Sequence, residues 1–182
     1  MNAIEMVQRL HRHRAWVNRN LLDAASGLAE EQLRATFPIG QGSVWQSLLH
    51  LYAAEYSWLE ALLGDDDPVV PGDLPGRMVG NQQAEGGIRT PDELRQRWSA
   101  LERRWVDYLA SLTPAALVEV VYKTSVVLGP GKRWETRRSD VLLHVCTHAQ
   151  YTAAQVVNML RQVGVAELPR TMLTSMARQE AV

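Results

Sequence analysis

Apolar residues recur at intervals of three and four along four long segments of the chain. This spacing places them on one face of an α-helix. We therefore expect amphipathic helices over about residues 2–26, 43–63, 90–112 and 139–164. Helices with one apolar stripe must bury it against one another, so the pattern predicts an all-α protein with a shared core.

Start and stop signals support these boundaries. The sequence Ser-Val-Trp-Gln at 43–46 has the form of a capping box. Thr-Pro-Asp-Glu at 90–93 combines a capping hydroxyl, a proline at the first helical position and a glutamate two residues later. Gly27 and Gly64 follow two of the segments and Gly164 ends a third, positions where glycine commonly terminates a helix.

Two stretches between the third and fourth helices alternate apolar and polar residues instead. These are residues 118–123 and 132–136, and Gly-Pro-Gly at 129–131 separates them. Alternation on both sides of a turn sequence predicts a small β-hairpin. Because two strands alone are marginally stable, we expect the hairpin to pack on the helices.

The connectors constrain the topology. The connector over residues 64–90 is rich in proline, glycine and aspartate and can run the length of a helix. It would let the third helix run parallel to the second. We therefore predict an up-down-down-up four-helix bundle with one long crossover. One domain covers residues 1–182, with a bundle core at 2–164 and a tail at 165–182 whose helical signal is weak.

Composition removes several function classes. With 182 residues, of which 46% are hydrophobic, the chain can bury a full core. A net charge of −1 argues against nucleic-acid binding, and the arginines of the first segment are read as a solvated helix face (Arg9, Arg12, Arg14 and Arg19). A single cysteine suits a reducing compartment, and no apolar run reaches the roughly 20 residues of a membrane span. We expect a cytoplasmic protein without a membrane partner.

Three of the five histidines form a candidate metal site. His144 and His148 are one helical turn apart, so their imidazoles project from the same face, and His50 lies on the second helix. All three fall at the border of an apolar stripe, beside small residues. A helical bundle builds a metal site in this way, with ligands from facing helices. The alternative is that each is a half-buried histidine bonded to a backbone carbonyl.

Other reactive side chains have simpler interpretations. Cys146 lies toward the apolar side of the fourth helix, where a thiol is inert. Glu55 falls in the apolar stripe of the second helix, which is unusual for a carboxylate. It would either support a histidine or accept hydrogen bonds from an arginine or a tryptophan. His11 and His13 are two residues apart, so they face different ways and are read as surface or border residues.

The helix sequences resemble a known family. The segments concerned are AWVNRNLL at 15–22, SVWQSLLH at 43–50 and LHVCTH at 143–148, with Gln155 beyond. They are similar to the DinB/YfiT-like superfamily of four-helix-bundle metalloenzymes. The resemblance covers nearly the whole chain in helix order and spacing, and its short motifs are degenerate.

The resemblance implies a divalent metal ion, zinc or nickel, held by one histidine of the second helix and two of the fourth. The first ligand corresponds to His50 and the first of the pair to His148. The second of the pair falls on Thr152, whose hydroxyl is a poor ligand for either ion. Three alternatives remain: His144 serves instead, water fills the position, or the site is lost.

The resemblance also implies a metal-dependent transferase or hydrolase acting on a small molecule, with a low-molecular-weight thiol as co-substrate in some relatives. The ion would lower the pKa of bound water or thiol. Thr152, Gln155, Tyr151 and Glu55 would then surround the ligands or face substrate, and homodimers are expected. The alternative is a non-catalytic, small-ligand-binding bundle that lost its metal through Thr152. DNA binding, suggested only by the family name, conflicts with the net charge.

Overall fold

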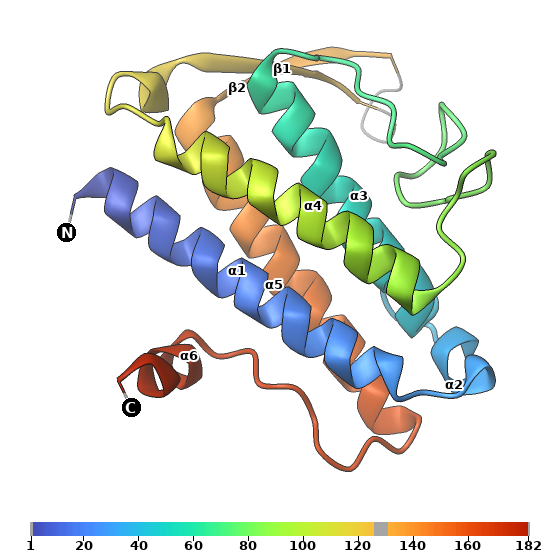
Figure 1. Ribbon diagram of the computed structural model, residues 1–182. Helices are drawn as coiled ribbons and strands as arrows, with labels where there is room; N and C mark the ends of the chain where they lie inside the picture. The colour runs from blue at the N-terminus through green and yellow to red at the C-terminus, as the bar shows by residue number, and fades with distance from the viewer. Residues whose placement is uncertain (1, 126–130, 182) are drawn as a thin grey trace.

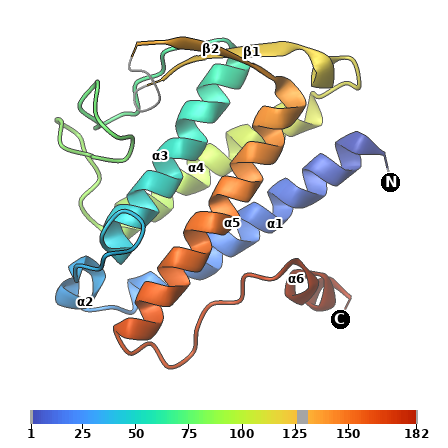
Figure 2. The same ribbon diagram turned by 180° about the vertical axis from the view of Figure 1, so that it is seen from behind.

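Four long helices form the body of the protein in the computed structural model, which describes residues 2–125 and 131–181 (Figure 1). Their bounds are α1 Ala3–Ser26, α3 Val44–Leu63, α4 Pro91–Ala110 and α5 Arg138–Gln162. α1 and α5 run in one direction and α3 and α4 in the other (Figures 1 and 2). The predicted four-helix bundle with up-down-down-up topology is therefore confirmed, and the 64–90 connector makes the crossover.

The helix starts follow the local chemistry that the sequence indicates. The Ser43 hydroxyl accepts a hydrogen bond from the Gln46 backbone N–H at 3.1 Å. Thr90 and Glu93 exchange hydrogen bonds as a capping box, with Pro91 at the first helical position. These contacts satisfy backbone N–H groups that have no partner within the helix.

The shorter elements are two helices, a 3₁₀ turn and a hairpin. Their bounds are α2 Glu30–Arg34, η1 Ala116–Val118, α6 Leu173–Glu180, β1 Val120–Thr124 and β2 Arg133–Arg137. The predicted hairpin is present, with antiparallel strands lying across the ends of α3 and α5 (Figures 1 and 2). Of its predicted turn, residues 129 and 130 lie outside the described residues. The α2 helix was not predicted, because five residues are too few to show helical periodicity.

The core lies between the four long helices, where large side chains from each are fully buried. They include Leu21, Leu48, Leu59, Leu94, Trp105, Leu142 and Met159. None of the helices in the described residues combines the length and hydropathy needed to span a bilayer.

Two predictions about α1 were wrong. Arg14, expected on a solvated face, is only 3% exposed, and His11, expected at the surface or border, is 2% exposed. His11 Nε2 lies 3.1 Å from the Leu142 carbonyl oxygen of α5, and its ring packs on Trp105 of α4. Both side chains point into the bundle because the core supplies polar partners for them there.

Candidate functional site

A cavity of about 390 Å³ lies between α3, α5, the hairpin and the connector that follows α3. We refer to it as the histidine pocket, because all three candidate metal ligands line it. Its described lining includes His50, Ala54, Trp58, Asp67, Met78, Val79, Lys123, Trp134, His144 and His148. The structure thus brings the three histidines from two helices to one concave surface, the usual location of a small-molecule site.

His50 and His148 meet across this pocket. Their Nε2 atoms are 3.3 Å apart, and the rings are inclined at 68°. Two nitrogen ligands about 2.0–2.1 Å from one tetrahedral zinc ion lie about 3.3–3.4 Å from each other. The two imidazoles are therefore spaced as two ligands of one ion.

The tautomer of His50 is set by its other nitrogen. Nδ1 lies 3.0 Å from the Val79 carbonyl oxygen, which can only accept, so Nδ1 carries the proton and donates. Nε2 of His50 therefore carries a lone pair, and it lies 3.3 Å from His148 Nε2, which can donate a hydrogen bond to it. Metal-binding histidines commonly have this arrangement, in which a carbonyl fixes the ring and its basicity.

The connector is held against α3 at this point. Gly80 has φ +85°, and a Cβ added to it would lie 2.5 Å from His50 Cα. Its N–H donates to Asp73 Oδ2 at 2.6 Å, and its carbonyl accepts from Gln46 Nε2 at 2.7 Å. The sequence of this segment predicts only a linker, and the contact between Gly80 and His50 is not apparent from it. The glycine content of the segment was the available signal, but it did not single out Gly80.

His144 lies in the same pocket without joining the pair. Its ring centroid is 5.8 Å from that of His148, and its ring packs edge-on against Trp58 at 5.3 Å. Within residues 2–125 and 131–181, no three His, Cys, Asp or Glu side chains are grouped closely enough to hold one ion. The side chains in place therefore fit two positions of a metal site, and a third ligand requires movement of His144 or a water molecule.

The three polar residues expected beside the histidines on α5 do not line the described pocket. Thr152 is one turn beyond His148 and 3% exposed, whereas Tyr151 is 69% exposed. Gln155 lies against Gly40, where an added Cβ would be 2.6 Å from its Oε1. A helical wheel gives the facing of a side chain on one helix, but not which neighbouring segment covers it.

Glu55 lies outside the histidine pocket. Its carboxylate accepts hydrogen bonds from Arg14, from Asn18 Nδ2 at 2.8 Å and from Trp98 Nε1 at 3.0 Å. The structure therefore shows Glu55 accepting hydrogen bonds from an arginine and a tryptophan, and not supporting a histidine. Arg14 also donates to Glu102 at 2.9 Å.

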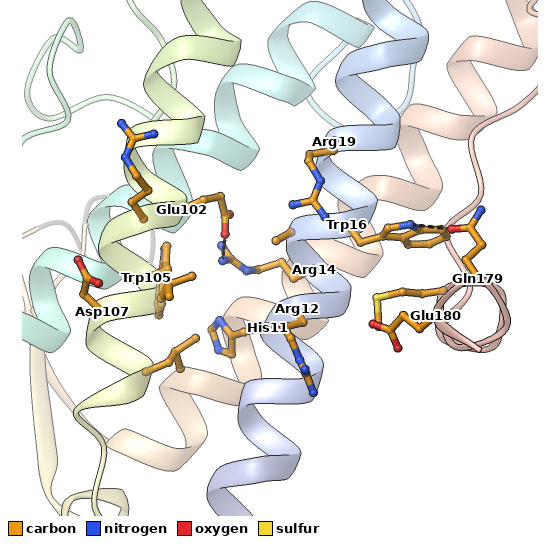
Figure 3. Close-up of a pocket in the computed structure, with 15 residues that line it drawn as sticks. His11, Arg12, Arg14, Trp16, Arg19, Glu102, Trp105, Asp107, Gln179 and Glu180 are labelled. Carbon is orange, nitrogen blue, oxygen red and sulfur yellow. Dashed lines mark hydrogen bonds and ion pairs between the residues drawn. The ribbon is translucent and has the colours of Figure 1, made fainter. Parts of the chain in front are cut away.

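A second cavity, of about 650 Å³, lies between α1, α4 and α6. Figure 3 shows Arg14 reaching from α1 toward Glu102 on α4, with Trp105 and His11 beside them. Arg14 is shared between two carboxylates, Glu55 and Glu102, and burial raises the pKa of Glu102 to about 7.

The protonation states in the histidine pocket follow from burial. Burial, together with the neighbouring imidazoles, lowers the pKa of His148 to about 4. Burial also lowers the pKa of His50 and of His144. The imidazoles are therefore neutral near pH 7, which is the form that binds metal. Burial lowers the pKa of Lys123 to about 8, so its amine remains mostly protonated there.

Cys146 is not a nucleophile candidate. Burial raises the pKa of its thiol to about 12, so the reactive thiolate is scarce at neutral pH.

Comparisons with known proteins match the chain to one family and one fold. The sequence profile of the DinB superfamily matches residues 13–156. Protein DinB of Bacillus subtilis strain 168 is 23% identical over 169 residues, covering 88% of each chain. YfiT of Bacillus subtilis, described as "a probable metal-dependent hydrolase with an unusual four-helix bundle topology", superposes with a TM-score of 0.66 at 16% identity and 90% coverage of both chains. At that identity the structural likeness concerns the fold.

Proposed function

Because the chain belongs to the DinB superfamily, we propose that it is a metal-dependent hydrolase whose histidine pocket binds a divalent ion and a small substrate. The observation that carries this proposal is the 3.3 Å separation of His50 Nε2 and His148 Nε2. The description of YfiT as a probable metal-dependent hydrolase favours hydrolysis over other metal chemistry.

In this proposal His50 and His148 hold zinc or nickel, and His144 or water completes the coordination. A bound ion supplies a nucleophile by lowering the pKa of water toward neutrality. The chain's own contribution is to fix His50 through the Val79 carbonyl and to keep the imidazoles neutral. The apolar walls, among them Trp58 and Met78, exclude bulk water from a bound substrate.

The same pocket would serve a transferase if a low-molecular-weight thiol took the place of water at the ion. The two activities differ in their co-substrate. Hydrolysis requires no thiol, whereas transfer requires one in stoichiometric amount.

The second candidate function is binding without catalysis. Thr152 stands where the resemblance expects a third imidazole, and no three-ligand group forms among the described residues. A bundle that lost its ion would keep the pocket as a small-ligand site. The variant Thr152→His separates the two candidates: if it gains tight zinc binding that the natural chain lacks, binding without catalysis is the better account.

The test of the first candidate is hydrolysis of a panel of activated esters, amides and phosphate esters by protein loaded with zinc or nickel, with and without added thiols. We expect turnover that is lost on chelation and lost in His148→Ala. The matched control is His13→Ala, since His13 contacts the Thr171 carbonyl on another side of the bundle. Turnover that survives chelation or the His148→Ala change would contradict the proposal.

A further inference from the structure

Lys123 is placed in the histidine pocket by the hairpin. It lies on β1, and its Nζ is 5.2 Å from the centre of the Trp58 ring. Among the described residues it makes one hydrogen bond, a long one of 3.4 Å to the Ser57 carbonyl oxygen. His144 packs on the edge of the same Trp58 indole. The tryptophan therefore lies between the imidazole end of the pocket and the ammonium group.

The charge of Lys123 is not neutralised by a close partner. It forms no ion pair with any of the described residues, and the carboxylates of Asp65 and Asp67 act on it only at longer range. Asp66, between them, is paired with Arg133. Of the described residues that line the pocket, Lys123 is the only lysine or arginine. A positive charge at a partly buried position of this kind attracts an anionic group from solution.

The other residues that line the pocket indicate what kind of molecule carries the anionic group. Ala54, Trp58, Met78, Val79 and Trp134 line the pocket with apolar and aromatic surface. The volume of about 390 Å³ is at the small end of the range for small-molecule sites. One ammonium, with two aspartates in the neighbourhood, suits a singly charged carboxylate better than a doubly charged phosphate.

We infer that Lys123 binds the carboxylate of an apolar or aromatic carboxylic acid whose reacting bond lies at the His50 and His148 end of the pocket. Lys123 is thus a specificity-determining residue for the substrate class. The inference concerns the same site as the proposed function and rests on it for the identity of the reacting end. The binding of the carboxylate itself requires no metal ion.

The test uses metal-free protein and two probes of the same size, 3-phenylpropionate and its neutral amide. Affinities are measured by following the indole N–H signals of Trp58 and Trp134 in NMR titrations. We expect the carboxylate to bind about tenfold more tightly than the amide, the effect of one charge-assisted hydrogen bond. Lys123→Met should remove that preference, and Lys123→Arg should retain most of it.

The matched control is Lys132→Met, since Lys132 is the chain's only other lysine and lies on the same hairpin, exposed over Trp134. It should keep the tenfold preference. Equal affinities for acid and amide in the natural protein, no binding of either probe, or a preference that survives Lys123→Met would overturn the inference.

Zinc uptake by the same proteins separates this inference from the proposed function. Lys123→Met should take up zinc as the natural chain does, because Lys123 is not among the proposed ligands. A carboxylate preference without zinc uptake would refute the metal-dependent function and leave the role of Lys123 standing. Zinc uptake without the carboxylate preference would refute the role of Lys123 and leave the metal-dependent function standing.

Discussion

Gly80 and His50 depend on each other at the scale of single residues. The Val79 carbonyl reaches His50 Nδ1 because the next residue lies flat against the α3 backbone. Only glycine combines that close approach with a φ of +85° at low cost. The direction of the His50 ring is therefore determined by a residue thirty positions away, which helical periodicity does not reveal.

Gly80→Ala should lower both stability and metal affinity. The matched control is Gly86→Ala, which has a similar φ of +72° but no atom within 4 Å of the added Cβ. We expect the control to lose about 1–2 kcal/mol from backbone strain alone and Gly80→Ala to lose about 1–3 kcal/mol more. Displacement of Val79 should also weaken zinc binding by about 10–100-fold. Urea denaturation and zinc titration measure the two effects, and equal losses in both variants would contradict the role given to Gly80.

Glu55→Ala should be strongly destabilising, because it leaves the buried Arg14 guanidinium without its main carboxylate partner. Breaking a buried pair from one side costs about 3–5 kcal/mol. The control is Asp66→Ala, which removes the exposed pair with Arg133 and should cost under about 1 kcal/mol. Chemical denaturation compares them, and a loss for Glu55→Ala no larger than that for Asp66→Ala would refute the importance of this network.

His11 should make stability fall in mild acid. Burial, with Arg14 nearby, lowers its pKa from the ordinary 6.5 to about 3. The unfolded chain therefore binds the proton first, so stabilisation is present above pH 6.5 and is lost as the pH falls from 6.5 toward 3. Between pH 7 and pH 5 the natural protein should lose about 2 kcal/mol more than His11→Gln. Denaturation at both pH values measures the difference, and parallel losses would show that His11 titrates normally in the fold.

At the scale of elements, the sequence predicts long helices well and short ones poorly. The capped starts at Ser43 and Thr90 are visible because a hydroxyl bonds a backbone N–H three residues on. α6 has only eight residues, and its position depends on distant partners: Trp16 Nε1 donates to Gln179, and Asn20 Nδ2 donates to the Arg170 carbonyl. Contacts of this kind span more than a hundred residues and have no local signature.

The attachment of α6 to α1 should depend on Met176, which is 3% exposed. Met176→Ala should cost about 2 kcal/mol through the cavity it leaves. Met172→Ala, at a position 64% exposed, should change stability by less than about 0.5 kcal/mol. Thermal unfolding of the pair measures the contrast, and similar melting temperatures would mean that α6 contributes no packing energy.

At the scale of the whole molecule, the topology and the location of the pocket follow from the sequence, but the arrangement inside the pocket does not. The long connector predicts parallel α3 and α4. Histidine spacing predicts only that His144 and His148 share a face, and the family resemblance adds His50 to the site. His144 is held apart from the pair of His50 and His148 by packing on Trp58 of α3, and the hairpin, which lies across the end of the bundle, adds further walls to the pocket. Lys123 reaches the pocket because it lies on β1 of this hairpin, so its role is visible only in the folded structure.

The most direct test of the proposed metal site is the zinc content of untagged protein after dialysis against zinc, compared with His50→Ala, His148→Ala and the control His13→Ala. The proposal predicts about one ion per chain in the natural protein and the control, and a large loss in each of the other two variants. No bound zinc or nickel in the natural protein, or the same content in His50→Ala, would contradict it.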